Sequence, residues 1–304
     1  MPLSAHVNTF AGSPLDRAAD RREDAAWLAA QLERDDGSAL VIWEGQVLTE
    51  QGPEGPRLAW LSPAMARDIV GDDWVFLGLW KEAPVFAVSF ESEADPTLGP
   101  LRGLGAFMDM RSAAAALPGS EAAMAGCGKS LFDWRRRHSF CAHCGQRSRS
   151  TCGGWKRVCD ACSTEHFPRV DPVVIMLATH EGRCLMGRQA AWPKGSMSAL
   201  AGFLEPGESI EEACARELNE EAGLTATAVT YHSSQPWPFP SSLMIGLFAE
   251  VEDDQAAPDQ TELEEVRWFT RDEIRAVLAG KHPEIRAPNP YAIARSLLEA
   301  WAAQ

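Results

Sequence analysis

Residues 202–224 read GFLEPGESIEEACARELNEEAGL, and this stretch decides the fold of the chain around it. Ser209 is followed three residues later by Glu212, which is the capping box that begins many helices. Gly223 stands where helices commonly end on a residue in the left-handed conformation. These signals predict a helix over residues 209–222.

Three glutamates share one face at the end of this predicted helix. At about 100° per residue, Glu217, Glu220 and Glu221 project within an arc of roughly 100°. Such like charges repel one another and crowd the negative end of the helix dipole. A solvated acidic face would not need them in line with the apolar stripe, whereas Mg²⁺ or Mn²⁺ prefers oxygen ligands and neutralises them. The pattern predicts a divalent-cation site, with Arg216 holding one carboxylate by a bidentate pair.

The same stretch resembles the Nudix box, G-x5-E-x7-R-E-U-x-E-E-x-G-U, in which U is a bulky aliphatic residue. Its fixed positions are all filled, by Gly202, Glu208, Arg216, Glu217, Leu218, Glu220, Glu221, Gly223 and Leu224. The resemblance implies a strand–loop–helix–loop inside a mixed sheet flanked by helices. It also implies hydrolysis of a nucleoside diphosphate linked to another group, with metal on the glutamates to clamp the diphosphate and activate water.

Four of the eight cysteines form two CxxC pairs, Cys141-Ala-His-Cys144 and Cys159-Asp-Ala-Cys162. Two such pairs separated by a short loop are typical of a Cys₄ zinc ribbon, and four thiolates leave no open position for catalysis. The sequence therefore predicts one structural zinc per chain. Two disulfides are the alternative, disfavoured in a cytoplasmic chain, and Cys152 is a competing ligand.

Other conspicuous residues near the ribbon are expected to be structural. The histidines expected at the surface are His138, His143 and His166. The cysteines expected as small buried apolar residues are Cys127, Cys184 and Cys214. The segment 126–130 ends like a phosphate-binding loop, but no strand precedes it and Ala123 replaces the first glycine, so this interpretation is rejected.

Downstream, residues 234–242 read SQPWPFPSS. Three prolines alternate with two aromatic residues, which predicts a stiff extended segment whose rings can stack on bases or nicotinamide. A rigid loop that packs these rings into the core is the alternative. The segment resembles S-Q-P-W-P-F-P-x-S, the signature of the NADH pyrophosphatase branch of the Nudix superfamily, which also has a Cys₄ ribbon just before the Nudix domain.

This second resemblance covers about residues 130–302 and implies hydrolysis of NADH and NAD⁺ to AMP plus the nicotinamide mononucleotide. Some members of the branch remove an NAD cap from RNA, and they are commonly homodimers. The catalytic residues that it implies are Glu217, Glu220 and Glu221. The implied ligands of catalytic Mg²⁺ or Mn²⁺ are these three, Glu262 and the backbone carbonyl of Ala201, and Glu220 is implied either as a ligand or to orient water. The implied substrate contacts are Phe167 and Phe203 around nicotinamide, with Gln235, Pro236, Trp237, Pro238, Phe239, Pro240, Ser241, Ser242 and Ala294 lining the nucleotide site.

The order of the predicted elements indicates an α+β fold with α/β-like alternation, in three parts. These parts are a small N-terminal α+β domain over residues 1–125, a linking helix and zinc ribbon over 126–167, and a Nudix domain over 168–304. Strands are predicted at 39–43, 74–79, 85–90, 173–178, 225–231, 243–251 and 266–269, and helices at 120–137, 209–222, 271–279 and 290–302. No internal repeat is visible in the sequence.

Composition narrows the classes of function. A chain of 304 residues, 45% hydrophobic and 23% charged, fits a globular protein of two or three domains. It shows no membrane span and no secretory signal, so the cytoplasm is the expected location. The net charge of −15 disfavours a general nucleic-acid binder. Between Lys129 and Arg169, however, nine basic residues stand against three acids, as a solvated surface or as a face that guides NAD-capped RNA.

Two rival functions stay open. One is a Nudix hydrolase of ADP-ribose or damaged nucleotides, against which the segment around Trp237 argues. The other is a zinc-ribbon nucleic-acid-binding regulator with an inactive Nudix domain. The complete set of glutamates and the acidic net charge argue against the regulator.

Overall fold

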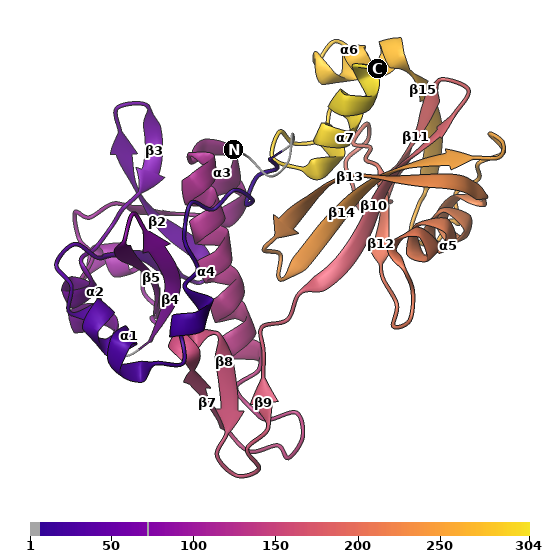
Figure 1. The fold of residues 1–304 in the computed structure, drawn as a ribbon. Coiled ribbons are helices and arrows are strands. Elements are labelled where there is room, and N and C mark those ends of the chain that lie inside the picture. The colour runs from indigo at the N-terminus through magenta and orange to yellow at the C-terminus, as the bar shows by residue number, and fades with distance from the viewer. Residues whose placement is uncertain (1–6, 72) are drawn as a thin grey trace. The chain divides into compact units, whose positions relative to one another are not determined.

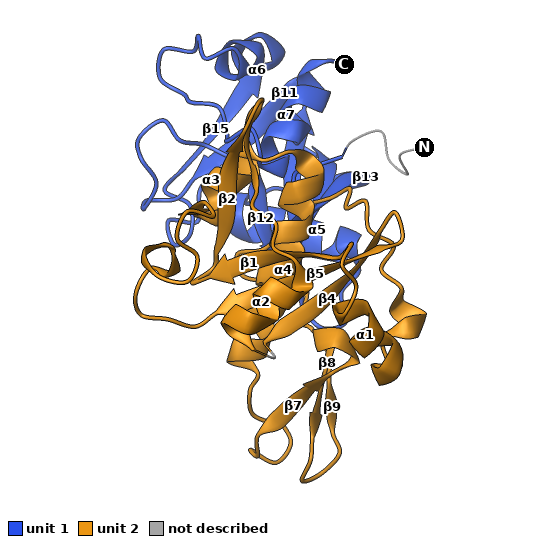
Figure 2. Cartoon of the chain, turned by 90° about the vertical axis from the view of Figure 1, so that its left-hand side faces the viewer, with its two compact units in different colours: residues 1–9, 171–236, 242–304 blue, residues 10–170, 237–241 orange. Residues whose placement is uncertain are grey.

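The computed structural model describes residues 7–71 and 73–304. The chain divides into two compact units, which are coloured separately in Figure 2. The C-terminal unit contains residues 1–9, 171–236 and 242–304, and the N-terminal unit contains residues 10–170 and 237–241. Each unit therefore includes a short piece of chain that the sequence order alone would give to the other.

A six-stranded sheet forms the centre of the N-terminal unit. Its strand order is β3-β2-β1-β5-β4, with β6 paired to β2, and only β1 and β5 are parallel. The strands are β1 (Ser38–Trp43), β2 (Gln46–Gly52), β3 (Gly55–Leu58), β4 (Trp74–Trp80), β5 (Ala83–Phe90) and β6 (Ala106–Met108). The helices of this part are η1 (Ala19–Arg21), α1 (Ala25–Leu32), α2 (Pro63–Val70), η2 (Pro96–Leu98), α3 (Met110–Ala116) and α4 (Gly119–Arg137). The three strands predicted in this part of the chain are thus confirmed as β1, β4 and β5.

Helix α4 confirms the helix predicted at 120–137 and explains its glycines. The motif at 126–130 lies inside this helix, so its rejection as a phosphate-binding loop is confirmed. A Cβ at Gly126 would lie 2.7 Å from the Phe10 ring, and one at Gly128 would lie 3.0 Å from Ala87. These glycines let neighbouring chain approach the helix closely. The expected division at residue 125 falls within this one continuous helix.

The cysteine-rich segment folds as a small three-stranded sheet in the order β7-β8-β9. It consists of β7 (Ser148–Thr151), the single turn η3 (Cys152–Gly154), β8 (Lys156–Cys159) and β9 (Glu165–His166). All of it groups with the N-terminal unit.

The C-terminal unit also has a six-stranded mixed sheet (Figure 1). Its order is β13-β14-β10-β11-β15, with β12 paired to β10, and β10 and β14 are parallel. The strands are β10 (Asp171–His180), β11 (Arg183–Arg188), β12 (Leu200–Phe203), β13 (Ala226–Trp237), β14 (Ser242–Val251) and β15 (Glu265–Thr270). The helices are α5 (Ile210–Ala222), α6 (Arg271–Leu278) and α7 (Ile293–Ala302). Every helix and strand predicted here is confirmed, although β13 runs six residues further than expected.

Helices cover both faces of this sheet, so its central strand is apolar along most of its length. Val174 and Met176 of β10 pack with Leu218 of α5, whereas Ile175 and Leu177 belong to the core beneath α6 and α7. Successive strand residues point to opposite faces, which gives each face its own core. This packing fixes α5 against the sheet and so fixes the glutamates that it carries.

The two sheets repeat one topology, although the sequence shows no repeat. In each, the first strand forms a hairpin with the second and runs parallel to the later strand of another hairpin, as β1 does with β5 and β10 with β14. Leu61 bridges to Ala39 of β1, just as β12 pairs with β10. Among the described residues, no helix is long and apolar enough to cross a membrane.

Candidate active site

Helix α5 begins and ends where the sequence predicts. The Ser209 N–H donates to Glu212 Oε2 at 2.7 Å, and the Glu212 N–H donates to Ser209 Oγ at 3.2 Å. Gly223 follows the last turn with a φ of 70°, a left-handed conformation that glycine adopts without strain. The capping box and the terminating glycine are both confirmed.

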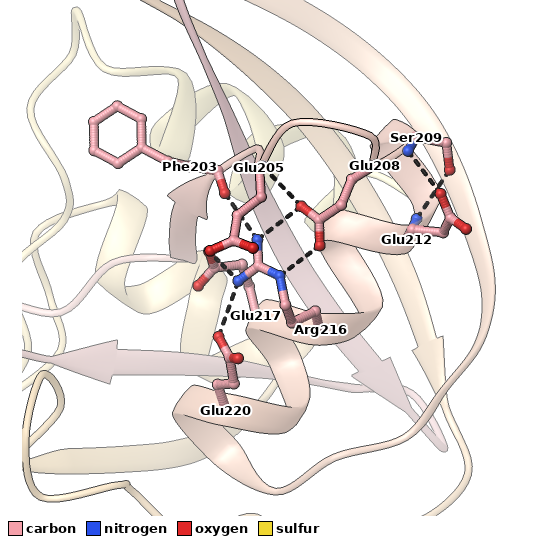
Figure 3. A network of polar contacts seen from close by, with 8 residues as sticks. All are labelled: Phe203, Glu205, Glu208, Ser209, Glu212, Arg216, Glu217 and Glu220. Carbon is pink, nitrogen blue, oxygen red and sulfur yellow. Dashed lines mark hydrogen bonds and ion pairs between the residues drawn. The ribbon is translucent and has the colours of Figure 1, made fainter.

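Arg216 of α5 bonds to three carboxylates, those of Glu208, Glu217 and Glu220 (Figure 3). It grips Glu208 with two bonds, Nε to Oε1 at 2.6 Å and Nη2 to Oε2 at 2.9 Å, which confirms the expected bidentate pair. Its Nη1 donates to Glu217 and Glu220, each at 2.9 Å, and Nη2 donates to the Phe203 carbonyl at 2.9 Å. The guanidinium lowers the pKa of Glu208 to about 2, helped by a bond from the Glu205 backbone. Glu208 therefore stays ionised and anchors the arginine.

Glu217 lies against the strand that precedes the helix. A Cβ on Gly202 of β12 would overlap the Glu217 carboxylate, so a larger residue here would force the Glu217 side chain to move. Burial raises the pKa of Glu217, and Arg216 opposes the shift. Its side chain is 12% exposed, against 58% for Glu220. Of the two, Glu217 is the one set into the protein.

Glu221 is the most buried carboxylate of the group. It is 4% exposed, and among the described residues its Oε2 has no hydrogen-bond partner. Burial first, and then the charges of Glu217, Glu262 and Asp259, raise its pKa to about 8, while a bond from the backbone of Ala201 opposes the shift. A buried carboxylate left without a partner is costly, and a hard cation is the partner that this acidic surrounding suits.

A loop before β15 adds a carboxylate from outside the helix. Its backbone is tied to α5 where the Asp259 N–H donates to the Glu221 carbonyl at 3.2 Å. The Asp259 carboxylate in turn accepts bonds from the N–H groups of Glu262 and Leu263, the shortest at 2.8 Å. Asp259 thus shapes the turn that presents Glu262. Asp259 is not among the residues predicted from the sequence, although aspartate commonly accepts bonds from the backbone N–H groups that follow it in a turn.

The carboxylates of the glutamates are not arranged around a common position for a metal ion in this structure. Within the part of the chain that the structure describes, only Cys141, Cys144, Cys159 and Cys162 bring three or more possible ligand atoms within 4.8 Å of one another. Glu217 and Glu220 are turned toward Arg216 instead. The oxygen donors and the unpartnered Oε2 of Glu221 fit a divalent cation, and its binding would draw Glu217 and Glu220 away from the arginine.

The four cysteines form the metal-binding arrangement that the sequence predicts. Sγ atoms of Cys144 and Cys159 lie 3.5 Å apart, and those of Cys141 and Cys162 lie 3.7 Å apart. These distances approach the edge of about 3.8 Å in a tetrahedron with Zn–S bonds of about 2.3 Å. Cys152 is not in the cluster, so it does not compete as a ligand here.

The surrounding residues differ in part from expectation. The half-buried His166 places Nε2 3.3 Å from Cys141 Sγ, at the cluster and not at the open surface, whereas His143 is exposed as expected. Cys184 and Cys214 are buried as predicted, but Cys127 is only half-buried, and Arg17 Nη1 lies 3.4 Å from its sulfur.

Phe203 and Phe167 are both large apolar side chains on the surface, 60% and 63% exposed. Phe203 lies at the edge of the C-terminal sheet, where β12 pairs it with Val173. Phe167 follows β9 in the N-terminal unit. Each ring is available for stacking, and their pairing around one ligand stays a prediction.

Three residues of the expected nucleotide site are buried instead. Gln235 is fully buried, and its amide donates to the carbonyls of Thr9 (3.1 Å) and Tyr291 (2.7 Å) while accepting from the Ile293 N–H (2.9 Å). Its Oε1 thereby satisfies one of the open N–H groups at the start of α7. Ala294 lies in the core beneath α7, and Pro238 is buried as well. Gln235, Pro238 and Ala294 are thus covered by protein in this structure, and their place in the nucleotide site stays a prediction.

The basic stretch is also partly internal. Arg136 and Arg149 are exposed, 62% and 60%, and pair with Asp133 and Asp160. Arg157, by contrast, is 9% exposed and donates to the hydroxyl and the carbonyl of Ser148. Its burial lowers its pKa. Arg157 therefore serves the fold of the ribbon and not an outer basic face.

Three family models match consecutive stretches of the chain. The NADH pyrophosphatase-like rudimentary NUDIX domain matches residues 36–134, the NADH pyrophosphatase zinc ribbon domain matches 136–167, and the NUDIX domain matches 168–290. The first of these matches accounts for the topology that the N-terminal sheet shares with the C-terminal one.

Several proteins similar to this chain are named NAD-capped RNA hydrolases. The NAD-capped RNA hydrolase NudC of Mycobacterium bovis (strain BCG / Pasteur 1173P2) is 38% identical over 95% of this chain and 92% of its own length. The NAD-capped RNA hydrolase NUDT12 of Macaca fascicularis is 43% identical, and that of Homo sapiens 41%, over 60% of this chain. The chain matches 42% of the length of these longer relatives.

The fold, the glutamate helix and these matches agree, and the chain belongs to the Nudix family. Its zinc ribbon and its rudimentary N-terminal domain are those of the NADH pyrophosphatase-like members of that family.

Proposed function

We propose that this protein hydrolyses the diphosphate of NADH and NAD⁺ to AMP plus the nicotinamide mononucleotide, and that it also removes NAD caps from RNA. The name of the Mycobacterium bovis relative, which matches over almost the whole chain, supports this choice of substrate. The observation that carries the proposal is Glu221, a buried carboxylate with an unpartnered oxygen at the end of a complete Nudix helix.

The proposed ligands of a catalytic Mg²⁺ or Mn²⁺ are Glu217, Glu221, Glu262 and the backbone carbonyl of Ala201. Such a cation neutralises charge on a diphosphate and makes water a better nucleophile. Glu220, which is 58% exposed, is proposed as a further ligand or as the group that orients the attacking water. Arg216 holds Glu217 and Glu220 until the cation binds, and Glu208 keeps the arginine in place.

Recognition of the dinucleotide is proposed to use the edge of the sheet beside Phe203. The parts of the signature segment proposed to line the site are Pro236, which is exposed, and Pro240, Ser241 and Ser242, which are half-buried. Trp237 and Phe239 are proposed to position these lining residues. Phe167 is proposed as the second ring at nicotinamide.

Cleavage of capped RNA would use a short basic face. Arg136 and Arg149 remain candidates to contact RNA phosphates, since both are exposed. Such contacts are independent of RNA sequence and weaken as salt rises. The acidic charge of the whole chain supports a short contact and not a long one.

The metal content, the location and the oligomeric state belong to the same proposal. One structural zinc per chain on the four cysteines, a cytoplasmic location and a homodimeric state are proposed with it. None of the eight cysteines forms a disulfide in this structure, which supports the cytoplasmic location. The proposed parts remain residues 1–125, 126–167 and 168–304, with the two exchanged segments noted above.

The test is turnover of NADH with Mg²⁺ or Mn²⁺, followed by mass spectrometry of the products. AMP and reduced nicotinamide mononucleotide are expected, with ADP-ribose a poorer substrate by kcat/KM. Preference for ADP-ribose would favour the rival Nudix hydrolase. No hydrolysis of either compound, combined with tight RNA binding, would favour the nucleic-acid-binding regulator.

A further inference from the structure

The tip of the β13–β14 hairpin is built into the N-terminal unit. β13 ends at Trp237 and β14 begins at Ser242, and residues 237–241 group with residues 10–170. The strands on either side belong to the C-terminal unit. The N-terminal unit therefore holds a turn whose two ends are strands of the sheet that carries the candidate active site.

Lys129 of α4 makes the polar attachment of this turn. Its side chain is 12% exposed, and Nζ donates to the Pro238 carbonyl at 2.8 Å and to Asp133 Oδ2 at 2.6 Å. Asp133 is 8% exposed and accepts a second bond from Arg136 at 2.9 Å. Because proline has no N–H, the carbonyl is the one main-chain group through which Pro238 can be held by a hydrogen bond. Lys129 therefore bonds to the only main-chain group of Pro238 that can form a hydrogen bond.

Aromatic rings make the apolar attachment. The rings of Trp237 and Phe239 are 5.0 Å apart, and both meet the edge or face of Phe10, at 6.5 and 6.0 Å. The Arg111 guanidinium lies 4.2 Å from the centre of the Phe239 ring, and Lys129 Nζ lies 5.5 Å from it. Both cations lie close enough to the ring to be attracted by its face. The rings of the signature segment thus face the N-terminal unit.

The strand register shows where the turn 237–241 joins the C-terminal sheet. Ser242 pairs with Asp171, and Met244 pairs with Val173. Val173 also pairs with Phe203 on its other side. Three neighbouring strands therefore bring the end of the turn and the exposed Phe203 ring to the same end of the sheet.

We infer that Lys129 and Arg111 are positioning residues for substrate: they fix the turn 237–241, which the proposed function assigns to the nucleotide site. This inference rests on the proposed function for its substrate. Neither residue needs to touch the dinucleotide. The rudimentary domain then serves catalysis by holding a segment of the catalytic sheet, without supplying a metal ligand.

Hydrogen–deuterium exchange tests whether the turn is held. Lys129→Met keeps an apolar stem and removes the donor, whereas Lys281→Met changes an exposed lysine as the matched control. The amides of Trp237, Phe239, Ser241 and Ser242 are expected to exchange at least about fivefold faster in the first variant and at the wild-type rate in the second. Equal exchange in both variants would overturn the inference, and this measurement does not depend on which substrate the enzyme takes.

Kinetics then test whether the held turn serves the substrate. Lys129→Met is expected to raise the KM for NADH about tenfold, equivalent to about 1.4 kcal/mol, with kcat within about twofold of wild type. Lys129→Arg, which keeps the charge, is expected to recover most of this loss. Arg111→Gln at an exposed position is expected to give the same pattern more weakly, and it tests the inference if Lys129→Met does not fold.

The results distinguish a failure of the positioning role from a failure of the proposed function. An unchanged KM in variants whose turn exchanges faster would overturn the positioning role. A parallel loss of kcat and thermal stability without rescue by arginine would also overturn it, because that is the pattern of a purely structural lysine. A wild-type protein inactive on NADH would instead refute the proposed function, and the exchange rates would still decide whether the turn is held.

Discussion

Replacing Glu221 by glutamine is expected to change catalysis and folding in opposite directions. The wild-type carboxylate is buried with one oxygen unpartnered among the described residues. Glutamine keeps its shape and can keep the bond from the backbone of Ala201, but it carries no charge to bind a cation. Turnover of NADH should fall at least about 10²-fold, a loss of roughly 2.7 kcal/mol of transition-state stabilisation.

The metal-free protein should gain stability from the same substitution. Burial raises the pKa of Glu221 from 4.5 to about 8. Below pH 4.5 this carboxyl is protonated in both the folded and the unfolded state and costs nothing. Between these two pKa values the unfolded chain has lost the proton while the folded chain keeps it, so stability falls as pH rises, and above pH 8 the loss is complete. At about 1.4 kcal/mol per unit, the cost at pH 7 approaches about 3 kcal/mol, which glutamine avoids.

Thermal unfolding from pH 4.5 to 8.5 measures this, on protein freed of Mg²⁺ and Mn²⁺ with its ribbon zinc retained. The midpoints of wild type and Glu221→Gln should nearly coincide at the acidic end and separate in favour of the variant as pH rises. Added Mn²⁺ should stabilise the wild type alone. Glu252→Gln, at an exposed position of the same unit, should follow the wild type throughout.

Two results would refute this reasoning about Glu221. One is a variant that is less stable than wild type at pH 8 without divalent metal, which would mean that the buried carboxylate is satisfied by the protein. The other is near-normal turnover, which would remove Glu221 from the catalytic site.

Four further expectations follow from the same structure. Gly202→Ala should lower kcat/KM for NADH at least about tenfold and weaken Mn²⁺ activation, because the new methyl group displaces the facing carboxylate; normal kinetics would show that the carboxylate has room to move. Cys159→Ser should lose zinc and several degrees of thermal midpoint, measured by metal analysis and calorimetry; a stable, active, zinc-free variant would contradict a structural metal. Trp237→Ala should lower kcat/KM for NADH about tenfold with the fold retained, and an unchanged value would leave the ring to packing alone. Replacing Arg136 and Arg149 together by glutamine should slow cleavage of NAD-capped RNA and flatten its salt dependence while sparing NADH, and equal losses on both substrates would assign the arginines to the fold.

The parts of the site that the sequence predicts are those specified by local chemistry. The ends of α5 follow from a capping box and a glycine within fifteen residues, and the zinc-ligand set follows from CxxC spacing. Arg216 reaches Glu208 because their separation of eight residues brings the loop back over the helix. Each of these depends on neighbours in sequence, which a single chain displays directly.

The parts that the sequence could not predict depend on distant contacts. The burial of Gln235 follows from acceptors and a donor on Thr9, Tyr291 and Ile293, which no local pattern links to it. Arg157 looks like part of a basic surface until the ribbon folds and covers it. The topology repeated in the two sheets leaves no repeat in the sequence, because strand order is preserved where side chains are not.

The repeated topology allows the roles of the two units to be separated on chemical grounds. α2 stands between β3 and β4 as α5 stands between β12 and β13, so the two helices occupy corresponding places in the chain order. α2 has eight residues and one acid, Asp68, whereas α5 has thirteen residues and five glutamates. A fold does not confer an activity by itself, and here the same arrangement of strands carries the proposed metal-binding carboxylates in only one of its two copies. The rudimentary copy has no comparable set of ligands on α2, and the feature that it does offer is the pairing of Lys129 and Phe10 with the turn 237–241. Its contribution to catalysis is then expected to be mechanical, in the KM for the dinucleotide, while the chemistry depends on α5.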